Sequence, residues 1–120
     1  MLGHMALGDL EREVMTQLWD AGEPLTVRQV HERVSRDRDL AYTTVMTVLD
    51  RLAKKGVVLQ EKADRAYRYA PAQSREEMTA GLMLDALQAT PDREAALAHF
   101  VGRLSPEALA AAIEAAKKGG

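Results

Sequence analysis

The chain has 120 residues, of which 47% are hydrophobic and 28% charged, with a formal net charge of −2 and no cysteine. This length suits one domain with a small appendage, and the composition is ordinary for a folded protein. The absence of cysteine excludes disulfides, thiolate zinc sites and cysteine nucleophiles. No apolar run approaches the roughly 18 residues that a spanning helix needs, so we expect a cytoplasmic protein without membrane insertion.

The apolar spacing predicts three helices in the first half of the chain, after an N-terminal segment, residues 1–8, that we expect to be disordered and cloning-derived. The first helix spans about Asp9 to Ala21. The second begins at a capping box formed by Thr26 and Gln29 and continues to about residue 36. The third covers about Tyr42 to Lys55, and Gly56 follows it at the position where helices often end.

A hairpin is predicted directly after the third helix. Its strands are Val57 to Lys62 and Ala66 to Ala70, and the chain turns around Asp64-Arg65. Three helices followed by a hairpin form the winged variant of the helix-turn-helix. We therefore predict a mostly α, α+β fold: a winged helix with a two-stranded wing over residues 9–71, followed by a helical domain over residues 72–120.

The second domain is predicted to contain three helices, at about 75–89, 91–103 and 106–117. Ser74 and Glu77 form a capping box for the first, and Thr90 and Ser105 each precede a proline at the start of the others. These helices carry more large apolar residues than three short helices can bury alone, which favours a two-fold partner. The alternative is that this segment folds back on its own winged helix. The residues expected to pair two copies are Leu82, Leu87, Leu97, Phe100, Val101, Leu104, Leu109 and Ile113.

The third helix is a candidate reader of duplex DNA. Val45, Val48, Leu49 and Leu52 have the spacing of a buried face, which leaves an exposed ridge of small polar and apolar side chains. Residues 51–68 carry six cations against two anions, whereas residues 72–120 carry five against seven. Positive charge near a polar helix suits phosphate and base contacts, although a solvated charged face is the alternative. The predicted DNA-binding residues are Tyr42, Thr43, Thr44, Met46, Thr47, Arg51, Arg65 and Arg68.

Other side chains are expected to be structural. Tyr67 and Tyr69 alternate to the face opposite Arg68, and Trp19 lies on the apolar side of the first helix, so all three are predicted to be core. Asp50 belongs to the exposed ridge and would be repelled by phosphate unless it pairs with Lys54 or accepts from cytosine N4.

No chemistry-bearing constellation is found. The histidines, at positions 4, 31 and 99, have no metal-ligand spacing and no plausible nucleophile beside them. We therefore expect no metal, no cofactor and no enzymatic activity. Two alternatives to a DNA-binding regulator remain: a winged-helix scaffold for protein–protein contact without sequence-specific DNA binding, and a regulator with a small-molecule pocket within residues 75–117.

Several short motifs together resemble the penicillinase and methicillin-resistance repressors, the BlaI/MecI family. They are Glu13-Val14-Met15 and Leu18-Trp19, Thr44-Val45 through Thr47, Arg51-Leu52, Lys54-Lys55-Gly56, and the run from Arg65 to Pro71. The resemblance extends over nearly the whole chain. It implies a homodimeric repressor on a palindromic operator, controlling genes for β-lactamases or penicillin-binding proteins.

The same resemblance implies a proteolytic site and a sensor-linked protease as a partner. The best-known members of the family are cut within the tail between Asn and Phe after a membrane sensor detects a β-lactam, and the matching bond here is His99-Phe100. This chain contains no asparagine, so it departs from the family at that bond. It also has Thr43 and Met46 at positions where staphylococcal-type members of the family have Lys and Arg, which implies a changed operator. Without cysteine it does not match the copper-responsive branch.

Overall fold

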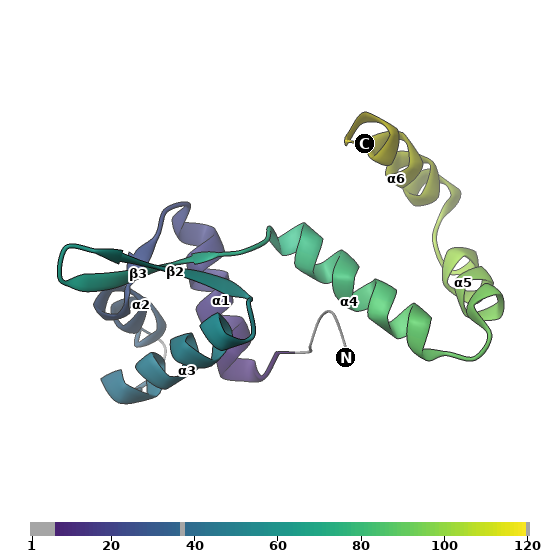
Figure 1. The fold of residues 1–120 in the computed structure, drawn as a ribbon. Helices are drawn as coiled ribbons and strands as arrows, with labels where there is room; N and C mark the ends of the chain where they lie inside the picture. Colours follow the sequence, from purple (N-terminus) through teal and green to yellow (C-terminus); the bar gives the residue numbers. More distant parts are fainter. Residues whose placement is uncertain (1–6, 37, 120) are drawn as a thin grey trace.

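A computed structural model describes residues 7–36 and 38–119 of the chain (Figure 1). Of the N-terminal segment 1–8 that was predicted to be disordered, residues 1–6 lie outside the described residues. A winged helix forms one end of the molecule, and three further helices extend away from it. The predicted fold class, mostly α with a winged helix, is therefore confirmed. Within the part of the chain that the structure describes, no helix is both long and apolar enough to cross a bilayer.

Three helices, α1 (Asp9–Ala21), α2 (Val27–Val34) and α3 (Tyr42–Lys54), form the body of the winged helix. The predicted capping box of α2 is present, because the Thr26 hydroxyl accepts from the Gln29 N–H at 3.2 Å while the Gln29 side chain accepts from the Thr26 N–H at 2.9 Å. The helix ends two residues before the predicted boundary.

Gly56 ends α3 as predicted. Its φ of +78° lies in the left-handed region, its N–H donates to the Ala53 carbonyl at 3.0 Å, and the Val57 N–H donates to the Leu52 carbonyl at 2.9 Å. These two bonds are the Schellman motif, which satisfies carbonyls at the helix end. The motif turns the chain directly from α3 into the wing.

The wing consists of β2 (Val58–Ala63) and β3 (Ala66–Pro71), and Asp64 adopts a φ of 57° in the two-residue turn between them. The prediction of two strands was incomplete. A short strand, β1 (Leu25–Thr26), pairs antiparallel with β3 and gives the order β1-β3-β2. A two-residue strand has no periodicity that a sequence could show, and only the buried Leu25 ties it to the core.

The core of the winged helix lies where the three helices meet the base of the sheet. The predicted buried face of α3 is confirmed, since Val45, Val48, Leu49 and Leu52 are all buried. They pack with Val14, Met15, Leu18, Leu25, Val30, Val34, Val58 and Tyr69. Trp19 is only partly buried at the edge of this cluster, so its prediction as a core residue was correct in part.

The tail consists of α4 (Arg75–Ala89), α5 (Arg93–Gly102) and α6 (Pro106–Gly119). The start of α5 was predicted too early, because Asp92, and not Thr90, caps the helix by accepting from the Ala95 N–H at 3.0 Å. The tail does not fold back on the winged helix (Figure 1). The radius of gyration is 17.5 Å, whereas a compact domain of this length has about 14 Å.

Candidate nucleic-acid interface

The exposed side of α3 carries the ridge that the sequence predicted. Thr43, Met46, Thr47 and Asp50 are all exposed, while the opposite side of the helix is buried in the core. We call these four residues the α3 ridge. Because the core fixes the back of the helix, the ridge is presented on a rigid support.

Two members of the α3 ridge make contacts that restrict their chemistry. The Thr47 hydroxyl donates to the Thr43 carbonyl at 2.9 Å, so its lone pairs and its methyl group are left facing outward. Threonine in this state can accept a hydrogen bond or contact a thymine methyl. The carboxylate of Asp50 lies 3.1 Å from the Lys54 ammonium, which is the i,i+4 pair considered above.

The N-terminus of α3 is open to an anion. Ala41 is the N-cap and supplies no side-chain acceptor, so the first N–H groups of the helix have no side-chain cap. Such groups favour phosphate. The neighbouring Tyr42 is positioned by an edge contact with His31, whose ring centroid lies 5.7 Å away. The His31 Nε2 in turn lies 2.7 Å from the Leu40 carbonyl and must donate to it.

A groove of about 760 Å³ separates the α3 ridge from the wing. It combines apolar, hydroxyl, amide and charged side chains, and its residues come from the start of α2, from α3 and from the wing. The lining residues are Thr26, Val27, Arg28, Tyr42, Met46, Thr47, Asp50, Gln60, Arg65, Ala66, Tyr67 and Tyr69.

The structure brings half of the predicted DNA-binding residues together. Tyr42, Met46, Thr47 and Arg65 line the groove. The other four are exposed without lining it: Thr43, Thr44, Arg51 and Arg68.

Arg68 lies on the other face of the wing. Its neighbours Tyr67 and Tyr69 point to the groove side, since successive strand residues alternate. Its partner in the ladder is Glu61, a residue of opposite charge on the same face. Arg68 is therefore less well placed for nucleic acid than Arg65.

Among the groove residues that sequence reasoning did not predict as DNA-binding are Arg28, Gln60 and Tyr67. The prediction that Tyr67 is core was wrong, since it is 49% exposed, although Tyr69 on the same face is buried. The wing extends beyond the helices, so only its base packs on them. Arg28 could have been found, because it lies at the start of the helix that precedes the recognition helix, and in a helix-turn-helix that preceding helix crosses the nucleic-acid backbone.

Part of the predicted positive charge is used within the protein. The Lys55 ammonium lies 2.8 Å from the Glu11 carboxylate, and Lys54 pairs with Asp50. Burial alone would raise the pKa of Glu11, but hydrogen bonds from Lys55 and from the Gly8 N–H outweigh it, so the pKa of Glu11 lies below its ordinary value. Within the described residues, the positive charge that faces the groove comes from Arg28 and Arg65.

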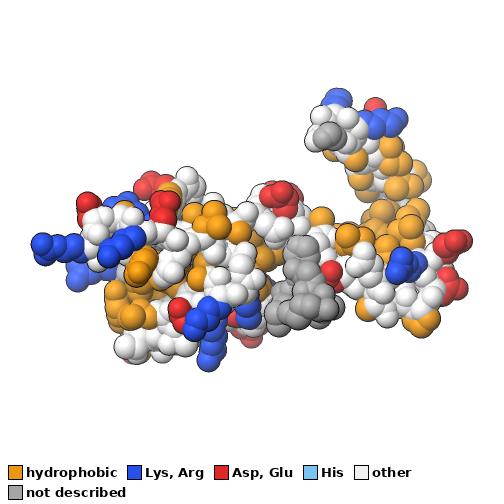
Figure 2. Space-filling view, viewed as in Figure 1, with side chains coloured by type: hydrophobic (Ala, Val, Ile, Leu, Met, Phe, Trp, Pro, Cys, Tyr) orange, Lys and Arg blue, Asp and Glu red, His pale blue; other side chains and the backbone are white. Residues whose placement is uncertain are grey.

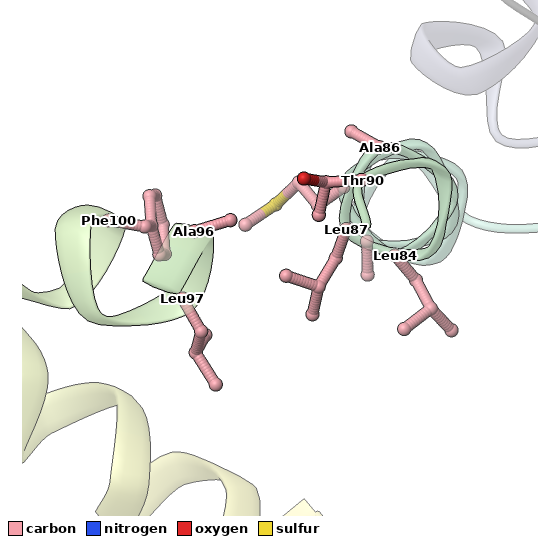
Figure 3. Close-up of a pocket in the computed structure, with 9 residues that line it drawn as sticks. Leu84, Ala86, Leu87, Thr90, Ala96, Leu97 and Phe100 are labelled. Atoms are coloured by element: carbon pink, nitrogen blue, oxygen red, sulfur yellow. The ribbon is translucent and has the colours of Figure 1, made fainter. Parts of the chain in front are cut away.

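Most of the large apolar side chains of the tail are exposed or only partly buried, and Met78 of α4 is the exception. No residue of α5 or α6 that the structure describes is buried. Figure 2 shows hydrophobic side chains gathered over this part of the molecule. A groove of about 480 Å³ opens between α4 and α5, and Figure 3 shows Leu84, Leu87, Leu97 and Phe100 on its two sides. Of the eight residues predicted to pair two copies, none is buried within the single chain.

The bond between His99 and Phe100 lies inside α5, and both residues are exposed. A protease that takes an extended substrate would have to unwind α5 to reach this bond.

No group of three or more His, Asp or Glu residues in the described ranges could hold a metal ion.

The sequence matches the family model described as penicillinase repressor over residues 7–117. It is also 62% identical to the transcriptional regulator BlaI of Mycobacterium tuberculosis over 104 residues, which cover 84% of this chain and 75% of that protein. This chain belongs to the penicillinase repressor family. Its relatives are named as transcriptional regulators and repressors, so this family member is a transcriptional regulator and not an enzyme.

Two solved structures of the same family match its winged helix. The solution structure of the DNA-binding domain of the repressor BlaI has a TM-score of 0.53 at 28% identity, over 59% of this chain and 85% of that one. The Bacillus licheniformis BlaI monomer, solved in complex with the blaP half-operator, has a TM-score of 0.52 at 27% identity, over 61% of this chain and 88% of that one. The predicted resemblance to the BlaI/MecI repressors is confirmed.

Proposed function

We propose that this protein is a homodimeric repressor that binds a palindromic operator in duplex DNA and controls genes for β-lactam resistance. The α3 ridge enters the major groove, and the wing contacts the flanking backbone. The observation that carries this proposal is the groove between α3 and the wing, which joins base-reading side chains to Arg28 and Arg65 on a rigid support. A relative with the same winged helix was solved on its half-operator, which supports this orientation.

The exposed apolar surface of the tail supports the dimeric part of the proposal. Nine large hydrophobic residues are exposed among those described, and five of them lie in the tail: Met83, Leu84, Leu97, Phe100 and Ile113. Exposed apolar surface of this kind marks an interaction site. A second copy of the tail would cover it and place two α3 helices on half-sites about 34–36 Å apart.

The mechanism that follows is occlusion of a promoter. Two weak half-site contacts joined in one dimer bind more tightly than either alone, because the second contact becomes intramolecular. Anything that separates the tails then releases the operator without altering α3. Cleavage at His99-Phe100 by a sensor-linked protease would act in this way.

The test is binding of the full chain to duplexes selected from a random pool, with the mass of the complex measured by sedimentation. We expect an enriched inverted repeat bound by two chains, and a single half-site bound at least about 10²-fold more weakly. A chain that enriches no sequence would contradict the proposal and favour a protein–protein scaffold. A chain that binds as a monomer would contradict the dimeric part alone.

A further inference from the structure

The connection between the wing and the tail is three residues long, and each residue is held by a hydrogen bond. The Ala72 N–H donates to the Val57 carbonyl at 2.9 Å, next to the start of the wing. The Gln73 carbonyl accepts from the Trp19 indole N–H at 2.9 Å. Ser74 caps α4, since its hydroxyl accepts from the Glu77 N–H at 3.0 Å. A connection restrained at every residue cannot swivel freely.

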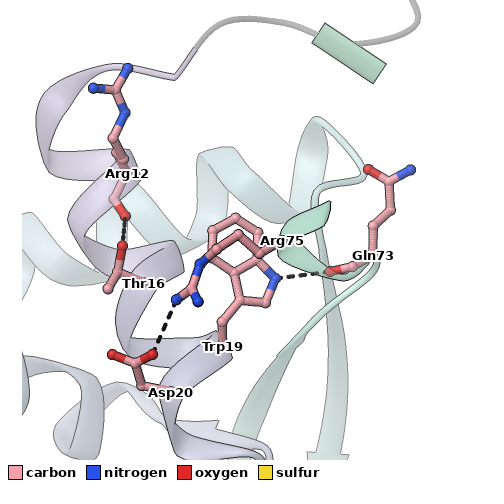
Figure 4. Close-up of polar contacts among 6 residues, drawn as sticks. All are labelled: Arg12, Thr16, Trp19, Asp20, Gln73 and Arg75. Carbon is pink, nitrogen blue, oxygen red and sulfur yellow. Dashed lines mark hydrogen bonds and ion pairs between the residues drawn. The ribbon is translucent and has the colours of Figure 1, made fainter. Parts of the chain in front are cut away.

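A polar cluster at the end of α1 also attaches the first residue of α4. The Arg75 guanidinium lies 5.2 Å from the centre of the Trp19 ring, and its Nη2 lies 3.1 Å from the Asp20 carboxylate (Figure 4). Arginine over an indole face combines a cation–π contact with stacking. We call Trp19, Asp20, Gln73 and Arg75 the Trp19 cluster.

The Trp19 cluster connects the tail to a helix that is anchored in the core of the winged helix. Trp19 and Asp20 belong to the last turns of α1, the helix whose residues Val14, Met15 and Leu18 are at most 1% exposed. The orientation of α4 is therefore restrained relative to the same core that supports α3.

Because α4 is long, a small change in its orientation would produce a large change in the distance between two paired winged helices. A helix of 15 residues is about 22 Å long, so a swing of about 10° at its base displaces its far end by about 4 Å. One base-pair step is about 3.4 Å. Loss of the angular restraint on α4 would therefore change the separation of two paired winged helices by about one base pair.

We propose that the Trp19 cluster is a positioning device that sets the half-site spacing the dimer accepts. This inference rests on the proposed function, because spacing has meaning only for a dimer on a two-part site. Arg75 and Trp19 are then determinants of operator choice although they lie outside the DNA-facing groove.

The first experiment measures the restraint without DNA. The chain has no cysteine, so spin labels attached through Glu32→Cys on α2 and Gln88→Cys on α4 are unique, and excess unlabelled chain isolates the distance within one protomer. We expect a narrow distance distribution that broadens in Arg75→Ala. Arg12→Ala is the matched control, because its guanidinium points away from the cluster on the same helix as Trp19 (Figure 4). A second variant, Trp19→Phe, keeps a smaller aromatic ring and removes the donor to the Gln73 carbonyl.

The second experiment measures spacing on DNA. The probes are the inverted repeat recovered by selection, the same duplex with one base pair or with about 5 base pairs (half a helical turn) inserted between the half-sites, and a single half-site. The 5-base-pair insertion should cost both the unsubstituted chain and Arg75→Ala about 10²–10⁴-fold in affinity. The one-base-pair insertion should also weaken binding by the unsubstituted chain. In Arg75→Ala the cost of that one base pair should shrink about tenfold, while half-site affinity stays unchanged, and Arg75→Lys should restore part of the discrimination.

The outcomes separate the two proposals. Unchanged distances and an unchanged cost of the one-base-pair insertion in Arg75→Ala and Trp19→Phe would overturn the positioning role and leave the dimeric repressor intact. An unsubstituted chain that is indifferent to the 5-base-pair insertion would contradict dimeric operator binding itself, and the spacing role with it. A loss of half-site affinity equal to the loss on the full site would mean that the cluster is merely structural.

Discussion

At the scale of single residues, the candidate interface depends on side chains that already make a hydrogen bond or an ion pair within α3. Thr47 donates to the Thr43 carbonyl, and Asp50 is neutralised by Lys54. What remains outward is an acceptor, a methyl group and the thioether of Met46. Such a surface discriminates by accepting from amino groups and by contacting thymine methyls, and it lacks the arginine that commonly reads guanine.

Thr47→Val tests this description, because valine keeps the shape and removes the oxygen. We expect one base position to lose discrimination worth about 1–3 kcal/mol, with little change elsewhere in the site. Competition binding with single-base operator variants measures it. Equal weakening on every sequence would mean that Thr47 does not read a base.

Arg65 and Arg68 form a matched pair on the wing. Arg65 lines the groove, whereas Arg68 points from the other face beside Glu61. Arg65→Ala should therefore reduce the slope of log affinity against log salt by about 1, and Arg68→Ala should reduce it less. The reverse order, in binding titrations at several salt concentrations, would place the DNA on the opposite side of the wing.

Glu11 gives the winged helix a predictable pH dependence. Its pKa is depressed in the folded state, so the stability it contributes is present at neutral pH and is lost as the pH falls below its ordinary value of 4.5. Glu11→Gln should lower the free energy of unfolding by about 1 kcal/mol near pH 7 and hardly at all near pH 3. Denaturant titrations at both pH values measure this, with the exposed Glu32→Gln as control. An equal loss at the two pH values would contradict a role for the charge.

At the scale of elements, the junction between α3 and the wing is fixed by backbone conformation. A Cβ added at Gly56, whose φ is +78°, would meet no other atom within 4 Å, so backbone strain alone opposes a larger residue there. Gly56→Ala should lower the free energy of unfolding by about 1–2 kcal/mol. Gly56→Asn should cost less, because asparagine tolerates this region. Thermal or denaturant unfolding measures both changes. Equal stability of the unsubstituted chain, Gly56→Ala and Gly56→Asn would show that the backbone at position 56 opposes neither substitution.

Elements with a clear period were predictable from the sequence. The spacing of Val45, Val48, Leu49 and Leu52 located the buried face of α3, and Ser74 with Glu77 located the start of α4. Two of the failures, β1 and Tyr67, had no local signal. The strand β1 is two residues long, and Tyr67 differs from Tyr69 only because the wing extends past the helices.

The charges show the same limit at the candidate site. Lys54 and Lys55 are adjacent in a basic run, yet both are paired with carboxylates, one of them on α1 and 44 positions away in the chain. Arg28, in contrast, belongs to no basic run and joins the groove only through the packing of α2 on α3. A count of charges along the sequence therefore placed the positive face only approximately.

At the scale of the whole molecule, an extended chain with an uncovered tail implies an assembly. The structure measures 50 × 31 × 27 Å, with the winged helix at one end and the apolar tail at the other. This separation lets one module read DNA while the other pairs two copies, and the Trp19 cluster joins them. The proposed function depends above all on two α3 ridges, one from each protomer, entering the major groove at the two half-sites.

Methylation interference on the selected duplex tests this most directly, because guanine N7 lies in the major groove and adenine N3 in the minor groove. We predict two patches of interference at guanine N7, centred about 10–10.5 base pairs apart on one face of the duplex. Interference confined to adenine N3, or a single patch at guanine N7, would contradict insertion of two α3 helices.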